Sequence, residues 1–469
     1  MATVTVKPPV VKTPISGHVN YTPAQQVMFA AMIDAVRKVY EKNGFNAFPL
    51  RPVETMEDIM RKGGATAKQT YGIVRNNPMP GDDGISRLAL PFDHTVPFAI
   101  WLADHLTEIH GIFKRYAIGQ VHRGEHAEPG RFRGFWQLDV DIAGRKLTPI
   151  NDVQCVMTMM KALEAIGIQN FTIYINHLTF AKALLAEFGL RKENFVKGLD
   201  IIDGLEKHPL NEVIQELLTL QPNLDRDKLN AVLALCKKKM TLGEIDQALD
   251  LNIQWAPETV TALQEMKQLF ASFESAGANR EKIGFCPGMV RGLDYYTGIV
   301  FETFLNQYPQ FGSIASGGRF DDLVGVFNSQ GADIQAVGGS IGPTRLFDRL
   351  LREGIIKPTR EVTSDVIVLY QKLDLQNTAL TVQNVAQRSF PTDIYTGNGD
   401  LREQLSFAST KGFPFAIIVS YNKNNEIQYA LKDLTLRTQG VFHQEITEVV
   451  AELQSTYDPQ RHGILNFTI

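Results

Sequence analysis

Residues 115–144 read RYAIGQVHRGEHAEPGRFRGFWQLDVDIAG, and the second half of this stretch alternates between two kinds of side chain. A period of two is typical of a β-strand whose apolar face packs on a core. Residues 115–123 are also strand-like, and the glycine-bounded segment 124–130 can reverse the chain, so the stretch predicts a β-hairpin. The apolar positions are Phe132, Gly134, Trp136, Leu138, Val140 and Ile142, and the alternate positions are Arg131, Arg133, Phe135, Gln137, Asp139 and Asp141.

The second set of positions has an unusual composition for a strand face, because arginines and aspartates surround one phenylalanine. One interpretation is a solvent-facing strand with salt bridges along it. The other is the floor of a binding site, with phosphate at the arginine end and an ammonium group at the aspartate end. Arginine suits phosphate because its planar guanidinium can donate two parallel hydrogen bonds. From this face alone, both interpretations stay open.

The segments around the hairpin predict a chain of several domains. Residues 23–43 place apolar side chains at helical spacing and precede Gly44, which predicts a helix. Residues 171–262 begin with a strand-like run and continue as amphipathic helical segments, so this region is predicted to be a helical insertion. The expected helices in it cover 178–190, 197–205, 210–220, 227–239 and 257–275.

The C-terminal part, residues 364–469, alternates apolar strand-like runs with helical segments. Such alternation predicts a small α/β domain with a largely parallel sheet. Residues 354–363 contain Pro358 and several charges and are the predicted linker. The remaining boundaries are a leader at 1–21 and two parts of a central domain at 22–170 and 263–353.

Composition excludes several classes of protein. The chain has 469 residues, of which 44% are hydrophobic and 21% charged, as in ordinary globular proteins. The three cysteines are scattered, which fits a reducing compartment and predicts neither a disulfide framework nor a zinc cluster. No apolar run approaches the roughly 20 residues that span a bilayer. The net charge of −4 means that an RNA partner would have to be held by local basic patches.

Two further stretches carry unusual residues. Residues 287–302 read PGMVRGLDYYTGIVFE, with an arginine, two adjacent tyrosines and glycines ahead of a predicted strand at 299–304. A tyrosine pair on its own is more often packing than ligand. Residues 312–324 read GSIASGGRFDDLV, and 338–350 read GGSIGPTRLFDRL, a predicted strand that enters a helix with one arginine after the proline.

Together these stretches resemble class II aminoacyl-tRNA synthetases, and most closely the histidyl-tRNA synthetases. The hairpin resembles their motif 2, in which the first strand ends in Arg-x-Glu, matched by Arg123 and Glu125. The resemblance implies that Arg123 holds the α-phosphate of ATP and that Glu125 binds the adenine amino group. It also implies that Phe135 stacks on adenine and that Arg131 reaches the outer phosphates. Motif 3 is matched at 338–350, which puts Arg345 over the adenine and against the γ-phosphate.

The string RGLDYYTG resembles the first histidine-specific motif of that family, and 312–324 resembles the second. The resemblance assigns catalysis to Arg291, beside the reacting α-phosphate, together with Arg123. Residues 88–99 match the family's Asp-x-Thr, which holds the α-ammonium group of histidine. The positions that the resemblance assigns to histidine binding are Asp93, Thr95, Arg123, Gln137, Asp141, Arg291, Tyr295, Tyr296, Gly317 and Gly318.

The chain departs from the family's usual pattern at four positions in these stretches. Pro91 replaces an arginine, His94 an apolar residue, Phe320 a tyrosine and Thr344 an acidic residue. His94 is expected to be a satisfied core or a surface histidine in preference to an extra ligand. Pro52 is the candidate for the motif 1 proline, whose family role lies at a dimer interface.

The resemblance implies an α+β fold in which helices flank an antiparallel, six-stranded class II sheet, with the helical insertion and a C-terminal anticodon-binding domain. The implied activity is that of a histidine–tRNA ligase with histidine, ATP and tRNA(His) as substrates, Mg²⁺ bridging the outer phosphates, and no metal ligands from a protein motif. A cytoplasmic homodimer without membrane attachment is expected, and an organellar copy stays open. Residues Lys411, Lys423, Lys432 and Arg437 are the candidates for RNA contact in the C-terminal domain, and Cys236 with Lys237–Lys239 is another.

Two alternatives remain beside this interpretation. One is a catalytically silent paralogue that senses histidine or uncharged tRNA, or acts as a regulatory subunit. Regulatory relatives lack the anticodon-binding domain and tend to lose the arginines, whereas this chain keeps Arg123, Arg291 and Arg345. The other is a class II synthetase for another amino acid, against which the RGLDYY string argues.

Overall fold

A computed structural model of the chain describes residues 15–61, 68–77, 79, 83–126, 128, 130–206, 208–248, 254–290, 296–328, 333–465 and 467–469. The chain forms two compact units. The larger, here called the catalytic unit, contains residues up to 20 and 36–349. The smaller, the C-terminal unit, contains 21–35 and 350–469. Helix α1 (Pro23–Lys42) matches the helix predicted at 23–43, and its residues divide between the two units.

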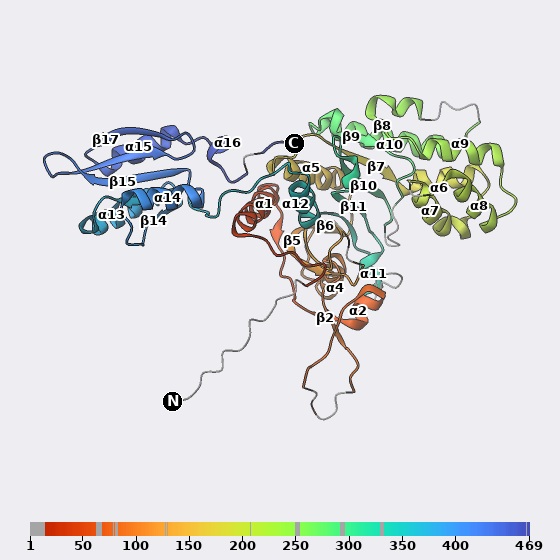
Figure 1. Cartoon of the computed structure of the whole chain (residues 1–469). Coiled ribbons are helices and arrows are strands. Elements are labelled where there is room, and N and C mark those ends of the chain that lie inside the picture. Colours follow the sequence, from red (N-terminus) through yellow and green to blue (C-terminus); the bar gives the residue numbers. More distant parts are fainter. Residues whose placement is uncertain are drawn as a thin grey trace. The chain divides into compact units, whose positions relative to one another are not determined.

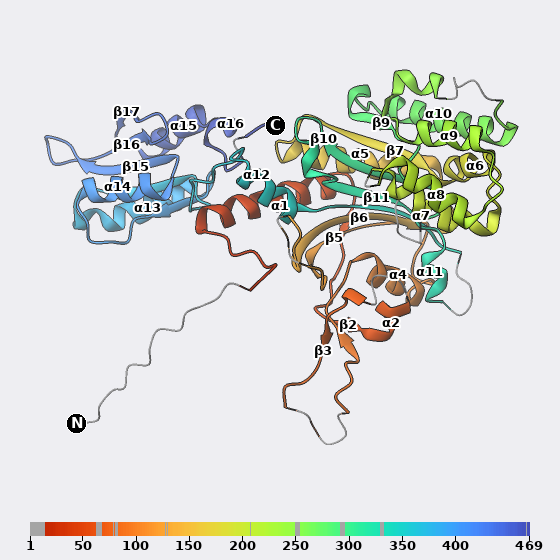
Figure 2. The same ribbon diagram turned by 45° about the vertical axis from the view of Figure 1, so that its right-hand side comes forward.

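The catalytic unit is built on a sheet whose strand order is β1-β5-β6-β12-β11-β10-β7-β9-β8. Each neighbouring pair from β5 to β7 is antiparallel, so the six-stranded antiparallel sheet expected from the sequence is confirmed. Short strands extend it at both edges and include two parallel pairings, β1 with β5 and β7 with β9. Figures 1 and 2 show these strands as one curved layer. The strands are β1 (Asn46–Ala47), β5 (Ile112–His122), β6 (Gly134–Gly144), β7 (Phe171–His177), β8 (Met240–Thr241), β9 (Ile283–Phe285), β10 (Ile299–Leu305), β11 (Ala315–Arg319) and β12 (Gln335–Ile341).

The two faces of this sheet serve different purposes. On one face Leu138, Val140 and Ile142 of β6 are buried. Helix α5 (Pro149–Ala165) packs on this face, since a Cβ added at Gly339 would meet the sulfur of Met159. This is the apolar face that the alternation in β6 predicts. On the other face, α4 (Thr95–Asp104) and α11 (Leu323–Val326) form a core cluster with Ala143 and Ala336 near one end of β6 and β12.

Smaller elements complete the catalytic unit. Strands β2 (Glu54–Thr55), β4 (Leu88–Ala89) and β3 (Gly72–Ile73) form a separate three-stranded sheet, preceded along the chain by the exposed Pro52. Helix α2 (Met56–Arg61) follows β2. Helix α12 (Pro343–Arg352) follows β12, as motif 3 predicts.

The region predicted to be a helical insertion contains a set of helices, and the element at its predicted end extends beyond it. The strand at its predicted start is β7, which pairs with β10 and so belongs to the main sheet. The predicted end at 262 falls inside a continuous helix, α10. The helices here are α6 (Leu178–Glu187), α7 (Phe195–Asp203), α8 (Leu210–Leu220), α9 (Arg226–Cys236) and α10 (Pro257–Ser275), with 3₁₀ turns η1 (Lys192–Asn194), η2 (Gly204–Glu206), η3 (Leu242–Gln247) and η4 (Arg280–Lys282).

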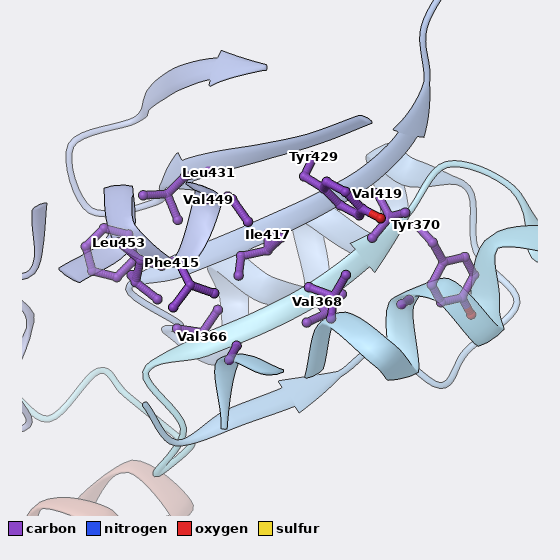
Figure 3. Packing of buried hydrophobic residues seen from close by; sticks show 14 of the residues in the cluster. Val366, Val368, Tyr370, Phe415, Ile417, Val419, Tyr429, Leu431, Val449 and Leu453 are labelled. Atoms are coloured by element: carbon purple, nitrogen blue, oxygen red, sulfur yellow. The ribbon is translucent and has the colours of Figure 1, made fainter. Parts of the chain in front are cut away.

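The C-terminal unit has a five-stranded sheet in the order β14-β13-β15-β16-β17. Strands β14, β13 and β15 are parallel as predicted, but β16 and β17 are antiparallel, so the sheet is mixed. Alternate residues of β13 and β15 pack with Leu453 in a buried apolar cluster (Figure 3). The elements are β13 (Val366–Tyr370), α13 (Gln376–Ala386), β14 (Thr392–Ile394), α14 (Leu401–Lys411), β15 (Phe415–Tyr421), β16 (Ile427–Asp433), β17 (Thr438–His443), α15 (Ile446–Thr456) and α16 (Pro459–His462).

Among the helices in the described part of the chain, none combines the length and apolar character that crossing a bilayer requires.

Candidate active site

One row of paired residues runs across the middle of the main sheet. Arg115 of β5 pairs with Asp141 of β6, which pairs with Gly338 of β12, which in turn pairs with Gly318 of β11. Residues paired directly across strands point to the same face. A Cβ at Gly338 would overlap the Asp141 carboxylate, and a Cβ at Gly318 would lie 2.7 Å from Cδ1 of Tyr296. Gly338 therefore makes room for the Asp141 carboxylate above β12, and Gly318 makes room for the Tyr296 ring above β11.

Three carboxylates are buried around this space. Asp93, Asp139 and Asp141 are at most 7% exposed. Burial raises the pKa of Asp141 to about 7 and that of Asp139 to about 6, in each case against the opposing effect of the Arg115 guanidinium. Asp93 contributes to both shifts through its charge, which brings all three acids into one electrostatic group. The solvent-facing interpretation of this strand face is therefore wrong.

The site also contains hydrogen-bond acceptors with no donor. Gln137 Oε1 and Asp139 Oδ1 are buried and have no hydrogen-bond partner in the described part of the chain. An unsatisfied buried polar atom costs about 1–3 kcal/mol. A ligand that brings N–H donors into this space would remove that cost.

The segment that precedes α4 forms one wall of the site. One Asp93 carboxylate oxygen accepts a hydrogen bond from the backbone N–H of Val96 at 3.0 Å, which fixes the first turn of the helix. Thr95 is the first residue of α4 and is partly buried. His94 is 2% exposed, and burial lowers its pKa to about 4, so the imidazole is neutral at pH 7. The expectation of a surface histidine is wrong. The ring is in the core, but its Nε2 has no hydrogen-bond partner among the described residues, so it is not fully satisfied there.

Arg123 lies between two aromatic rings. Its guanidinium carbon is 4.6 Å from the centre of the Phe92 ring and 5.3 Å from that of Phe135. Its Nε donates to the Phe92 carbonyl at 3.3 Å. Cation–π contacts of this kind hold an arginine in place while its remaining N–H groups stay available. The predicted pair of Arg123 and Phe135 is thus brought together.

A second group of arginines lies at the start of β6 and on α12. Burial lowers the pKa of Arg345, and the charges of Arg349 and Arg131 lower it further. Arg131 pairs with Glu125 at 3.0 Å, and Arg345 donates to the Phe311 carbonyl at 2.8 Å. Because the charges of Arg131 and Arg349 act on Arg345, the three guanidinium groups are close in space, and this group would bind an anion favourably.

Arg349 belongs to this group but was not predicted. A Cβ at Gly130 would lie 2.8 Å from its Nε, which puts the side chain against the loop of the hairpin. The signal was present in the sequence, because Arg345 and Arg349 are four residues apart on α12 and so share one face of the helix.

The two glycines of the second histidine-specific motif differ in position. Gly318 lies under Tyr296, as described above. A Cβ at Gly317 would instead lie 2.5 Å from the Phe301 ring, on the face that α5 covers. The missing side chain of Gly318 therefore leaves space on the pocket face, whereas a contact of Gly317 with the pocket would involve its backbone. Two other predicted residues, Arg291 and Tyr295, lie outside the described residues.

Two buried contacts support the site from behind. Arg319 forms a bidentate pair with Asp152 of α5, at 3.1 and 3.0 Å, and its carbonyl accepts from the Thr297 N–H next to Tyr296. Thr344, which stands where the family usually has an acidic residue, is fully buried. Its hydroxyl accepts a hydrogen bond from the backbone N–H of Trp136 at 2.9 Å. This bond joins α12 to β6, so the departure has a clear structural role.

The C-terminal unit contains a separate cavity of about 550 Å³. Its described lining includes no acidic residue and five cations. Arg360 pairs with Asp365 at 2.7 Å, whereas the other four form no ion pair with another described residue. These four are Lys357, Lys432, Arg437 and Arg461. Of the lysines predicted to contact RNA, Lys411 is paired instead with Glu361 at 2.7 Å. The cavity therefore has an uncompensated positive charge.

Comparison with known proteins agrees with this geometry. A family model described as histidyl-tRNA synthetase matches residues 17–346. A histidine–tRNA ligase of Finegoldia magna is 30% identical over 94% of this chain and 99% of its own length. One of Clostridium tetani is 32% identical over 91% of this chain and 94% of its own length.

Solved structures give the same result. A crystal structure of the histidyl-tRNA synthetase from a Nostoc species matches with a TM-score of 0.81 at 28% identity, and the match covers 95% of this chain and 99% of that one. A Bacillus halodurans structure, titled as an ATP phosphoribosyltransferase regulatory subunit/histidyl-tRNA synthetase, matches with a TM-score of 0.67 at 22% identity and shows the fold alone.

Proposed function

The chain belongs to the histidyl-tRNA synthetase family, and we propose that it is a histidine–tRNA ligase whose amino-acid site is the acidic face of β6. In the first step the histidine carboxylate attacks the α-phosphorus of ATP, which forms histidyl-adenylate and releases pyrophosphate. In the second step a terminal ribose hydroxyl of tRNA(His) attacks the adenylate carbonyl, which forms the histidyl ester and releases AMP.

The observation that carries this proposal is the group of buried acceptors and acids on one sheet face. Histidine is rich in donors, because it carries three ammonium N–H groups and at least one imidazole N–H. Asp93 and Thr95 would bind the ammonium group, with Gln137 Oε1 as a further acceptor. Asp141 would accept from the imidazole, under the Tyr296 ring and beside Gly318. An apolar amino acid of similar size would leave these buried acceptors unpaired, which is a strong basis for rejection.

The arginines supply the complementary site for ATP. Arg123 would hold the α-phosphate, and Phe135 beside it would stack on adenine. Arg131 and Arg345 would hold the outer phosphates, and Glu125 would bind the adenine amino group as well as Arg131. We add Arg349 to this set because of its place beside Arg345. Mg²⁺ would bind mainly through phosphate oxygens and water, and would neutralise charge on the outer phosphates.

Catalysis of adenylate formation requires positive charge next to the α-phosphoryl oxygens, where negative charge grows in the transition state. The family resemblance assigns this role to Arg291, with Arg123 as the second cation and Tyr295 as a companion of Tyr296 over the imidazole. Loss of one fixed donor at such a position typically lowers the rate by about 10²–10³-fold.

The C-terminal cavity supports an RNA-binding role for its unit. Lysine and arginine side chains bind RNA phosphates best when no carboxylate already neutralises them. Lys432 and Arg437 line the cavity and form no ion pair with another described residue. We further propose a homodimer in the cytoplasm, as the family resemblance implies.

The proposal is tested by charging purified tRNA(His) with labelled histidine. The wild-type protein should load it, and Arg291→Ala should reduce loading by at least about 10²-fold while its circular dichroism spectrum is unchanged. Loading by Arg291→Ala at more than half the wild-type rate would contradict the assignment of the catalytic cation. A folded wild-type protein that binds histidine and tRNA without loading would instead be a silent sensor.

A further inference from the structure

Arg115 is a fully buried arginine in the middle of β5, with 0% of its surface exposed. Its guanidinium carbon lies 4.2 Å from the centre of the Phe98 ring and 5.0 Å from that of Phe48. Burying a guanidinium between aromatic rings is costly unless the charge is paired and hydrogen-bonded. Arg115 pairs with Asp141 of β6 and therefore lies on the face opposite the apolar residues of that strand, so packing of the apolar core does not explain it.

The partners of Arg115 come from two different parts of the candidate histidine site. Its Nη2 pairs with Asp141 Oδ2 at 2.7 Å and donates to the His94 carbonyl at 2.9 Å. Asp141 stands at the imidazole end of the proposed pocket. His94 stands between Asp93 and Thr95, at the ammonium end. One nitrogen atom therefore joins the two ends of the pocket.

We propose that Arg115 is the positioning residue of the histidine pocket, which keeps Asp141 ionised and oriented as an imidazole acceptor and fixes its distance from the Asp93–Thr95 segment. This inference rests on the proposed function. Arg115 acts through Asp141 and the backbone and does not itself contact histidine.

The electrostatic surroundings of Asp141 explain why it needs such a residue. Burial and the charges of Asp139 and Asp93 raise its pKa, and the Arg115 guanidinium opposes them. The other titratable groups that interact with Asp139 or Asp141 are Arg123, which directly follows β5, Tyr40 on α1 and Cys155 on α5. His94 faces Arg115 as a neutral ring. Arg115 is thus the one cation that Asp141 contacts among the described residues, and without it the pKa of Asp141 would rise further.

Arg115→Met and Arg115→Lys test this proposal in histidine-dependent ATP–pyrophosphate exchange between pH 6 and 9. In Arg115→Met we expect the KM for histidine to rise at least about tenfold at pH 7, because a protonated Asp141 loses its charge-assisted hydrogen bond. The KM for ATP should change less than about twofold. The pH at which the histidine KM begins to rise should move upward by at least about one pH unit. Titration of free histidine is common to all variants, so it cancels in this comparison.

Arg115→Lys separates charge from geometry. A lysine keeps the positive charge, but its ammonium is one bond shorter and a poor substitute for a fork that serves two acceptors. We expect the pH dependence of the wild type with a histidine KM raised about threefold or more. Arg191→Met, which removes an exposed arginine of the insertion, is the matched control and should match the wild type.

Equal increases in the KM values for histidine and ATP, or an unmoved pH dependence in Arg115→Met, would overturn the proposal. If Arg115→Met does not fold, Arg115→Lys decides, and a histidine KM within twofold of the wild type would overturn it. Failure of the wild type to activate histidine would instead contradict the proposed function, so the two results are distinguishable.

Discussion

At the scale of single residues, two glycines shape the candidate site as much as the charged side chains do. Gly338 and Gly318 sit in one row with Asp141, and any Cβ there would enter the space of the Asp141 carboxylate or the Tyr296 ring. Glycine in a strand interior weakens the sheet, so its presence here marks a close approach. The missing side chains of Gly338 and Gly318 therefore give the pocket its space for the Asp141 carboxylate and the Tyr296 ring.

Gly318→Ala should therefore impair histidine binding. The added Cβ would lie 2.6 Å from the Ile299 carbonyl and 2.7 Å from Tyr296 Cδ1, so the ring or the strand must move. We expect the histidine KM in pyrophosphate exchange to rise at least about tenfold, since a misplacement of about 1 Å can cost that much. Gly243→Ala, where the nearest atom would be 4.0 Å away, is the control and should match the wild type. An unchanged KM in Gly318→Ala would mean that Tyr296 does not bound the pocket.

The raised pKa of Asp141 predicts a pH dependence of the wild type. With a pKa of about 7, the carboxyl is mostly protonated at pH 6 and mostly ionised at pH 8. Because the ionised form is the acceptor, the histidine KM should fall as pH rises from 6 to 8. Asp141→Asn has no carboxyl to titrate, so its KM should be high throughout and should retain only the titration of histidine itself. Parallel pH profiles for the two proteins would contradict this assignment.

Sequence patterns predicted much of the residue chemistry. The alternation in 131–142 and the motif resemblance identified Asp93, Asp139 and Asp141, which the fold does bring together. Arg115 was missed because its burial and its partners depend on β5–β6 pairing and on the segment before α4. The sequence did not distinguish Gly317 from Gly318, because adjacent strand residues face opposite sides and only the register tells which one faces the pocket.

At the scale of elements, α12 and β6 are joined by one buried hydrogen bond. Thr344→Val keeps the shape but removes the acceptor of the Trp136 N–H. A buried donor left without a partner costs about 1–3 kcal/mol. The thermal unfolding temperature should fall by several degrees in Thr344→Val and much less in Thr344→Ser, which retains a hydroxyl. Equal stability of the valine variant and the wild type would contradict this role.

The N-terminus of helix α6 is capped by the side chain of His177, whose protonation depends on pH. The His177 Nδ1 accepts a hydrogen bond from the Thr179 N–H at 3.1 Å, which needs a neutral imidazole. Burial, with Arg319 and Lys182 nearby, lowers the pKa of His177 to about 4 from a value near 6.5 in an unfolded chain. This contribution to stability is complete above about pH 6.5 and is lost as pH falls toward 4.

His177→Asn provides the test, because asparagine is a good helix cap that does not titrate. Between pH 7.5 and 5 the unfolding temperature of the wild type should fall more than that of His177→Asn. His94, which also has a lowered pKa, is present in both proteins and does not affect the difference. An equal fall in both would mean that His177 does not contribute.

Local periodicity predicted helices better than it predicted which sheet a strand joins. The insertion helices were found because their apolar spacing lies within each segment. Strand β7 was assigned to the insertion because its partner β10 lies more than a hundred residues further along the chain. The antiparallel direction of β16 and β17 was not predicted, since strand direction is set by the connection and not by the strand's own residues.

At the scale of the whole molecule, each unit is proposed to contact a different part of the reaction. The catalytic unit holds the acids and arginines of the amino-acid and ATP sites, and the C-terminal unit holds an uncompensated basic cavity. This division predicts that charge removal in the cavity affects tRNA loading but not amino-acid activation.

The double variant Arg437→Gln with Arg461→Gln tests this division. We expect the KM for tRNA(His) to rise about tenfold, with a weaker dependence on salt because fewer phosphates are neutralised. Histidine-dependent pyrophosphate exchange should be unchanged. The control is Arg388→Gln with Arg402→Gln, which removes the same charge from the same unit outside the cavity. If both double variants raised the KM for tRNA(His) equally, the net charge of the protein would explain the effect, and the cavity would have no specific role.

The most direct measurement of the central claim is ATP–pyrophosphate exchange by the wild-type protein with each of the twenty amino acids in turn. The buried carboxylates on one face of β6, together with Gln137 Oε1, which has no partner among the described residues, predict exchange with histidine and none above background with the others. Exchange with a different amino acid, or none with histidine from a folded protein, would contradict the account.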